Sequence, residues 1–171
     1  MLDSNTLQTV LGYCRSLVEK RLGFNCKRPT VAAIYNYHQT EIGLNTSGQP
    51  TAKQFEAIKN KGVEVVINLA PSSAENSLQD EQKLVESMSM FYVHIPVDFR
   101  NPREEDFSQF VAILEQYSYP SLWIHCAANM RVSAFLYRYR VQILKHKKSD
   151  AIRDLYHIWK PFGVWRRFLE M

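Results

Sequence analysis

The segment SLWIHCAANMRVSAF, residues 121–135, joins a strand signal directly to a helix signal. Its apolar run at 122–124 is typical of a strand that is covered on both faces, as in a parallel sheet. Small residues follow, and Arg131 then opens an amphipathic helical pattern. A strand, a tight loop and a helix N-terminus direct backbone N–H groups and the helix dipole at one point, which favours an anion there. Cys126 lies at that point, and such surroundings stabilise a thiolate. The segment therefore predicts a nucleophilic cysteine that faces an anionic substrate.

The same segment resembles the active-site loop of the cysteine-dependent protein tyrosine and dual-specificity phosphatases. The pattern of that family is His-Cys, five residues, Arg, and then Ser or Thr. His125, Cys126 and Arg131 match it, and Ser133 takes the last position after an inserted Val132. Only four residues separate Cys126 from Arg131, and the usual loop glycine is missing. The segment therefore resembles a phosphatase loop that is one residue short before the arginine.

The resemblance implies that Cys126 attacks phosphorus and that Arg131 holds two phosphate oxygens with its planar fork. The backbone of the four intervening residues would complete the phosphate site: Ala127, Ala128, Asn129 and Met130. His125 would fix the loop through its ring. Ser133 would either donate to the sulfur or act only as a serine of the first helical turn, and both alternatives stay open.

A phosphomonoester has a poor leaving group, so the resemblance also implies an acid that protonates the leaving oxygen. In this superfamily the acid is an aspartate on the loop after the preceding strand. Asp98, in the segment PVDFRNP at 96–102, matches that position, although a loop aspartate also often bonds its own backbone. Asp106 is the second candidate, but a carboxylate in a first helical turn often only complements the helix dipole. Asn68 matches an asparagine that braces the phosphate loop from behind.

Strand and helix signals alternate along the chain. Residues 31–46 are rich in β-forming side chains, 51–54 form a capping box for a helix that ends at Gly62, and 63–69 are the strongest strand. Strand, helix and strand in this order predict a right-handed crossover in a parallel sheet. Further signals predict a strand at 91–95 and helices within 78–88, after Pro102, after the cysteine segment, from Ser149 and at 162–169. We therefore expect one α/β domain of the protein-tyrosine-phosphatase type, with a mostly parallel sheet of four or five strands flanked by helices.

The first thirty residues carry a helical apolar stripe, made of Leu7, Val10, Leu11, Cys14, Leu17 and Val18. We expect residues 1–30 to be a helical extension packed on a phosphatase-like domain of residues 31–171. Cys14 would then be a small core residue, and Cys26 an incidental cysteine in a connector. The resemblance covers residues 42–168, and its segment SGQP at 47–50 is typical of a small bacterial branch of the superfamily.

Composition limits the classes of function. The 171 residues suit one domain, and a net charge of +4 fits anionic partners but is too small to imply nucleic acid. Three cysteines form neither a disulfide framework nor a paired metal spacing, which suits a reducing compartment. Neither a signal peptide nor a membrane span is recognised. We expect a cytoplasmic enzyme that needs no metal and no cofactor.

The expected activity is hydrolysis of a phosphomonoester through a phosphocysteine, on a phosphorylated small molecule or a phosphoprotein. Inorganic phosphate or sulfate should bind the loop, and the short loop predicts weak turnover. An alternative is a rhodanese-like sulfurtransferase that carries a persulfide, because many rhodaneses also have four residues between cysteine and arginine. Sulfur transfer needs no acid, so Asp98 distinguishes the two. A third alternative is a pseudophosphatase that binds phosphate without turnover.

Overall fold

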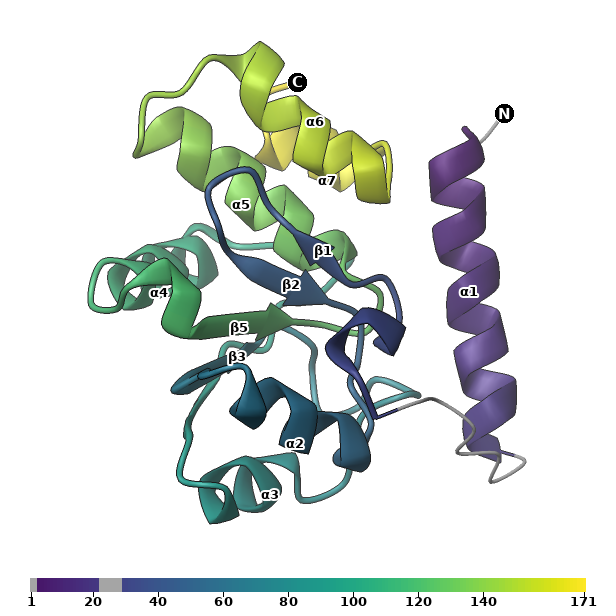
Figure 1. Cartoon of the computed structure of the whole chain (residues 1–171). Coiled ribbons are helices and arrows are strands. Elements are labelled where there is room, and N and C mark those ends of the chain that lie inside the picture. The colour runs from purple at the N-terminus through teal and green to yellow at the C-terminus, as the bar shows by residue number, and fades with distance from the viewer. Residues whose placement is uncertain (1–2, 22–28) are drawn as a thin grey trace.

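A computed structural model describes residues 3–21 and 29–171. Its core is a five-stranded sheet in the order β1-β2-β5-β3-β4 (Figure 1). The strands are β1 (His38–Gln39), β2 (Asn45–Ser47), β3 (Val65–Asn68), β4 (Phe91–His94) and β5 (Leu122–His125). Only β1 runs antiparallel to its neighbour, whereas β2, β5, β3 and β4 pair in parallel. This arrangement confirms the predicted, mostly parallel α/β sheet.

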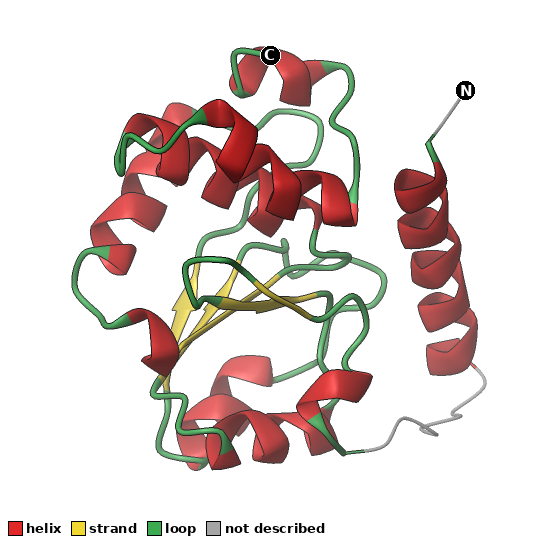
Figure 2. Cartoon of the chain, turned by 45° about the horizontal axis from the view of Figure 1, so that its top comes forward, coloured by secondary structure: helices red, strands yellow, loops and turns green. Residues whose placement is uncertain are grey.

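Helices cover both faces of the sheet (Figure 2). One face carries α2 (Ala52–Asn60), α3 (Glu81–Ser87) and the short helix η1 (Val31–Ala33), while the other carries α4 (Glu104–Leu114), α5 (Met130–Gln142), α6 (Lys148–Ile158) and α7 (Val164–Phe168). A further short helix, η2 (Tyr119–Ser121), leads into β5. Successive strand residues alternate between the two layers, so Val66 and Trp123 face α2 whereas Ile67 and Ile124 face α5. The continuous apolar strands of the sequence are therefore explained by burial on both sides.

Two local predictions need correction. Residues 31–46 do not form one long strand segment, because 31–33 form η1 and a turn with Gly43 at φ 87° separates the short β1 and β2. The helix predicted from Ser149 is α6, and it begins at Lys148. Ser149 and Asp150 therefore lie inside its first turn and do not cap it. The capping box of α2 is confirmed, since the Thr51 N–H donates to Gln54 Oε1 at 2.9 Å.

The prediction for α1 (Ser4–Arg21) is right about the helix and wrong about which of its faces is buried. The apolar stripe faces outward: Leu7 is 46% exposed, Leu11 is 59% exposed, and Cys14 is exposed as well. The buried side chains of α1 are Thr6 and Thr9. Cys14 is therefore not a core residue, and Cys26 lies outside the described residues.

Hydrogen bonds explain this orientation. The Thr9 hydroxyl donates to the Ile158 carbonyl at 2.7 Å, the Asn5 amide donates to the Tyr156 carbonyl at 2.8 Å, and the Thr6 hydroxyl accepts from a backbone N–H. The polar face of α1 thus docks on the end of α6, and Figure 1 shows the helix beside the carboxyl ends of β2 and β5. None of the helices in the described ranges is long and apolar enough to span a bilayer. The division into a helical extension of residues 1–30 and a phosphatase-like domain of residues 31–171 stays a prediction.

Candidate active site

The end of β5 and the start of α5 enclose a short loop, residues 126–131, which we call the cysteine loop. Cys126 follows His125 directly and is fully buried. Its backbone N–H donates to the Ser47 carbonyl at 3.3 Å, which ties the loop to the neighbouring strand β2. The helix α5 begins at Met130, so Arg131 lies in its first turn. The predicted order of strand, cysteine, tight loop and helix-opening arginine is therefore present.

Asn129 makes the turn of the cysteine loop, which lacks the glycine that is usual in phosphatase loops. Its backbone is left-handed, with φ 65° and ψ 0°, a conformation that asparagine adopts more readily than most residues. Its side-chain amide donates to the Asn36 carbonyl at 2.9 Å and to Thr46 Oγ1 at 3.0 Å. The absence of a glycine therefore does not prevent the turn.

Two other asparagines hold the carbonyls of the cysteine loop. Asn76 Nδ2 donates to the Ala127 carbonyl at 2.8 Å, and Asn36 Nδ2 donates to the Ala128 carbonyl at 2.9 Å. Peptide N–H and C=O groups point in opposite directions, so the amide that follows the Ala127 carbonyl is turned away from Asn76. Within the described ranges, the N–H groups of Ala127, Ala128, Met130 and Arg131 have no acceptor. The loop thus offers several free donors near the sulfur, as an anion site requires.

Arg131 supplies a positive charge beside these donors. The side chain is half-buried, and its Nε is buried with no hydrogen-bond partner in the described part of the chain. A buried donor on a charged group is costly when it is unpaired. The guanidinium carbon lies 5.3 Å from the centre of the Phe99 ring. An anion in the cysteine loop would accept a hydrogen bond from Nε. A solvent-exposed arginine would not need such an anion, because water would accept its hydrogen bonds.

Asp98 lies in the loop between β4 and α4. Its side chain is exposed, and Oδ1 accepts from the Arg100 N–H at 2.9 Å, the local turn bond that was one of its two interpretations. The next residue, Phe99, packs against Arg131 and also against Trp159 and Trp165, with ring centroids 5.7 and 5.3 Å away. The loop that carries Asp98 is therefore in contact with the cysteine loop.

Asp106 is engaged elsewhere. It is 4% exposed and pairs with Arg103 at 3.0 Å in the capping box that begins α4. Asp106 thus acts as a carboxylate of the first helical turn, which was the alternative to catalysis in the sequence analysis.

Behind the cysteine loop lies a buried carboxylate that the sequence did not reveal. Glu81, the first residue of α3, is 5% exposed and accepts from Asn68 Nδ2 at 2.9 Å and from the Tyr92 hydroxyl at 2.9 Å. The Gln49 side chain also donates to it. His125 is fully buried, and its Nε2 lies 3.1 Å from Glu81 Oε1, an ion-pair contact without the alignment of a hydrogen bond.

The neighbours of Glu81 favour the ionised form of its carboxyl group. Burial by itself raises the pKa of the Glu81 carboxyl, but the electrostatic interaction with His125 and the hydrogen bonds from its neighbours outweigh burial and lower that pKa below its ordinary value. Asn68 thus reaches the loop indirectly, through Glu81 and His125, while its Oδ1 accepts from the Ala70 N–H at 2.7 Å. Gln49, which belongs to the SGQP segment, also donates to Glu81, so this segment helps to hold the buried carboxylate in place. A single acidic residue at a helix start carries no local signal of such burial.

The Ser133 hydroxyl is bonded within its own surroundings. It donates to the Met130 carbonyl at 3.0 Å and accepts from Trp159 Nε1 at 3.2 Å. These bonds correspond to the first-turn alternative for this serine. No group of three or more His, Cys, Asp or Glu side chains in the described ranges is arranged to hold a metal ion.

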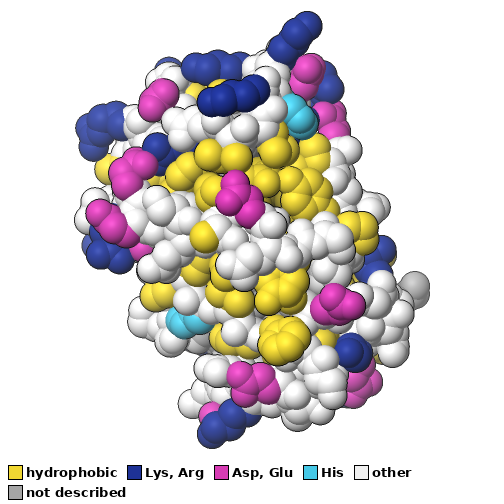
Figure 3. All heavy atoms as spheres, turned by 90° about the vertical axis from the view of Figure 1, so that its left-hand side faces the viewer, with side chains coloured by type: hydrophobic (Ala, Val, Ile, Leu, Met, Phe, Trp, Pro, Cys, Tyr) yellow, Lys and Arg dark blue, Asp and Glu magenta, His cyan; other side chains and the backbone are white. Residues whose placement is uncertain are grey.

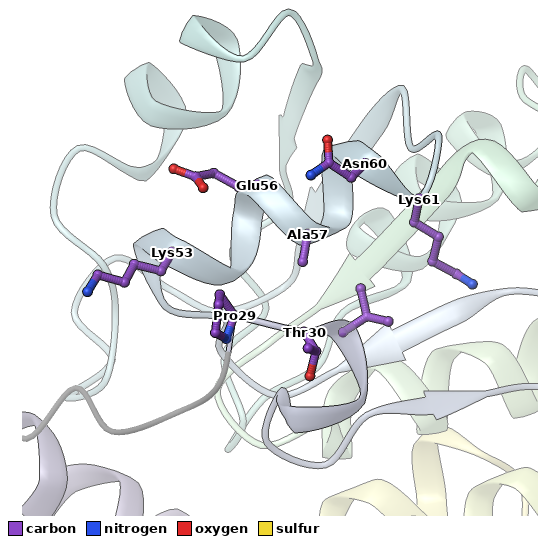
Figure 4. A pocket seen from close by; sticks show the side chains of 8 residues that line it. Pro29, Thr30, Lys53, Glu56, Ala57, Asn60 and Lys61 are labelled. Atoms are coloured by element: carbon purple, nitrogen blue, oxygen red, sulfur yellow. The ribbon is translucent and has the colours of Figure 1, made fainter.

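Other surfaces offer less to an anion. A hollow of about 440 Å³ beside α2 is lined in part by Lys53, Glu56 and Lys61, but the two lysine side chains extend in opposite directions (Figure 4). On the face at the amino ends of the strands, hydrophobic side chains occupy the centre and most Lys and Arg side chains lie toward the edge (Figure 3). Of these three places, the cysteine loop is the one that combines free backbone N–H groups with the buried, unpaired Nε of Arg131.

Known proteins show the family of this chain. Residues 29–159 match the family model described as "DSP-PTPase phosphatase fused to NAD+ Kinase". A crystal structure of a candidate phosphatase (DUF442) from Shewanella putrefaciens is 35% identical, with a TM-score of 0.71, over 82% of this chain and 92% of that chain. No curated protein matches the sequence.

Two further structures share the fold. A candidate phosphatase from Neisseria meningitidis is 22% identical, with a TM-score of 0.62, over 77% of this chain and 96% of that chain. The core catalytic domain of the PP-IP phosphatase SIW14 from S. cerevisiae is 13% identical, with a TM-score of 0.65, over 81% of this chain and 85% of that chain. At these identities the likeness concerns the fold alone. The match to the family model and the 35% identity to the Shewanella protein carry the family assignment. The chain belongs to the family described as "DSP-PTPase phosphatase fused to NAD+ Kinase", within the superfamily of cysteine-dependent protein tyrosine and dual-specificity phosphatases.

Proposed function

We propose that the protein hydrolyses a phosphomonoester, with Cys126 as the nucleophile, Arg131 as the main phosphate-binding side chain and Asp98 as the acid. The observation that carries this proposal is the buried, unpaired Nε of Arg131 beside the free N–H groups of the cysteine loop. Membership of a phosphatase family supports the same reaction. The substrate would be a phosphorylated small molecule or a phosphoprotein.

In the first step the Cys126 thiolate forms a bond to phosphorus while the bond from phosphorus to the leaving oxygen breaks. Asp98 gives its proton to that oxygen, which leaves as an alcohol. In the second step a water molecule attacks the phosphocysteine, and the Asp98 carboxylate accepts a proton from it. Phosphate and the Cys126 thiolate are released. Arg131 and the loop N–H groups stabilise the charge on the transferred group in both steps.

The test is phosphate release from p-nitrophenyl phosphate by the full chain. Cys126→Ser should abolish turnover, because the hydroxyl is a far weaker nucleophile. Arg131→Lys keeps the charge but loses the planar fork, and a lost transition-state donor costs about 10²–10³ in rate. Cys14→Ser, on the exposed face of α1, is the matched control and should keep full activity. Unchanged turnover in Cys126→Ser would contradict the proposal.

The four-residue spacing between Cys126 and Arg131 favours one other activity, sulfur transfer through a Cys126 persulfide. Thiosulfate and cyanide give thiocyanate with such an enzyme, and we expect this protein to form little. Ready thiocyanate formation without phosphatase turnover would replace our proposal by the sulfurtransferase. Tight phosphate binding without either reaction would identify a pseudophosphatase.

A further inference from the structure

The helix α1 lies outside the residues matched by the family model. The N-terminal half of α1 is nevertheless linked to the cysteine loop. Asn36 forms this link. Its side-chain amide donates to Thr9 Oγ1 of α1 at 3.1 Å and to the Ala128 carbonyl at 2.9 Å. One NH₂ group carries two hydrogens, so both bonds can form together. The position of α1 and that of the loop backbone are therefore coupled through a single side chain.

A second link lies near the other end of α1. Lys20 Nζ donates to the carbonyls of Glu75 and Ser77, at 2.9 and 2.7 Å. The residue between them, Asn76, is 7% exposed and holds the Ala127 carbonyl. Both asparagines that fix the cysteine loop are thus connected to α1, one through Thr9 and the other through the segment that Lys20 binds.

Between these links α1 comes very close to the body of the protein. A Cβ atom at Gly12 would lie 2.6 Å from the Tyr35 ring, so only glycine permits this approach. The Tyr35 hydroxyl also donates to the Thr9 carbonyl. Figure 1 shows α1 standing beside the carboxyl ends of β2 and β5, the edge of the sheet from which the cysteine loop departs.

Tyr13 follows Gly12 on this inner side. It is half-buried and packs against the apolar cluster that contains Cys126 and Ala127. Burial raises the pKa of its hydroxyl, the negative charge of Glu75 acts in the same direction, and the positive charge of Arg131 opposes them. Tyr13 is therefore a neutral ring within electrostatic reach of Arg131.

We propose that α1 forms one wall of the active site and that Tyr13 limits the size of the group attached to the phosphate. The part of the inference that concerns the substrate rests on the proposed phosphatase reaction. Access of reagents to Cys126 can be measured without that reaction. Cys126 and Asn129 are fully buried, and Phe99 already lies over Arg131, so a wall formed by α1 leaves little room around a bound phosphate. Tyr13 is then a specificity-determining residue that lies outside the family domain.

Alkylation of Cys126 tests the wall independently of turnover. Iodoacetamide and N-(1-pyrenyl)iodoacetamide react by the same displacement but differ greatly in size, and mass spectrometry of the Cys126 peptide gives each rate. Tyr13→Ala should accelerate the bulky reagent about tenfold, the effect of removing about 1.4 kcal/mol of steric exclusion, and should leave iodoacetamide little changed. Tyr13→Phe keeps the ring and should behave like the native protein.

Two controls keep the result interpretable. Leu11→Ala lies on the exposed face of the same helix and should alter neither rate at Cys126. The midpoint of urea denaturation shows whether each variant remains folded, and Tyr13→Leu replaces Tyr13→Ala if the latter unfolds. An unchanged rate for the bulky reagent, or an equal acceleration of both reagents, would overturn the inference.

Turnover provides the second readout. The ratio of kcat/KM for 3-O-methylfluorescein phosphate to that for p-nitrophenyl phosphate should rise in Tyr13→Ala, because only the larger leaving group meets the wall. Loss of activity in Cys126→Ser with an unchanged ratio in Tyr13→Ala would refute the wall alone. Activity that survives in Cys126→Ser would instead refute the proposed phosphatase mechanism.

Discussion

Replacement of the buried carboxylate behind the cysteine loop is the most demanding test of the site. Glu81→Ala removes the acceptor for Asn68, Tyr92 and Gln49 and leaves His125 without its ion-pair partner. Each buried donor left unpaired costs about 1–3 kcal/mol, so the loss of this shared acceptor costs about 3–5 kcal/mol in total. We therefore expect Glu81→Ala to lower the free energy of unfolding by about this amount.

Glu81→Gln is a graded version of the same change. It keeps the volume and one acceptor oxygen, and the unpaired Oε1 of Gln49 is available to accept from the new amide. The main loss is then the negative charge, and a hydrogen bond to a charged group is worth about 1–2 kcal/mol more than a neutral one. The destabilisation should fall between zero and that of Glu81→Ala.

Urea denaturation at pH 7 measures both variants. Glu86→Ala, an exposed position on the same helix α3, is the control and should lie within about 0.5 kcal/mol of the native protein. If Glu81→Ala costs no more than Glu86→Ala, the buried cluster does not hold the fold together, and the support for His125 that we infer from it is wrong.

The dependence on pH follows from the lowered pKa of Glu81. The ionised carboxylate stabilises the folded chain at pH values above the ordinary carboxyl pKa of 4.5, and this contribution disappears as the pH falls through the lower folded value. The difference in unfolding free energy between the native protein and Glu81→Gln should therefore be full at pH 7 and shrink below pH 4.5. A difference that grows on acidification would contradict the assignment.

Three further predictions concern the cysteine loop and its acid. Asp98→Asn should slow the hydrolysis of an alkyl phosphate more than that of p-nitrophenyl phosphate, because nitrophenolate leaves without a proton; equal losses in the two initial rates would move the acid elsewhere. Asn129→Gly and Asn129→Ala both lose the bonds to Asn36 and Thr46, but alanine also meets a left-handed strain of about 1–2 kcal/mol, so thermal melting should rank glycine as the milder change. Iodoacetamide should label Cys126 in the native protein despite its burial, since the free N–H groups of the loop favour an anionic reacting group there, and peptide mapping that finds label only at the exposed Cys14 would contradict this.

The sequence predicted those parts of the fold whose signals are local. The apolar run at 63–69 became β3, the run at 122–124 became β5, and the capping box at Thr51 begins α2. Each of these depends on neighbours within a few residues. The packing of α1 does not, because its buried Thr9 bonds to Ile158, which lies 149 residues away. An amphipathic pattern identifies a helix, but hydrogen-bond partners from distant elements decided which face was buried.

The same distinction separates the parts of the site. Cys126, Arg131 and the helix start at which we propose an anion site were evident, because they follow one another along the chain. The support behind them was not, because Glu81 gathers Gln49, Asn68, Tyr92 and His125 from four different segments. Asn36 and Asn76 were missed for the same reason. No periodicity or spacing brings such residues together before the sheet is formed.

The short loop can be understood from Asn129. Its left-handed backbone completes the turn, and α5 begins at the next residue, so the N–H groups of Met130 and Arg131 come from the first helical turn, where they have no partner within the helix. One amide of the longer family loop is lost, and a lost donor costs about 10²–10³ in rate. The buried Nε of Arg131 is a charged donor that is also present in the longer family loop, so it offers a strong bond to an anion without replacing the missing amide. The loop therefore retains the means to bind phosphate, while its chemistry should be slower than that of a full ring of donors.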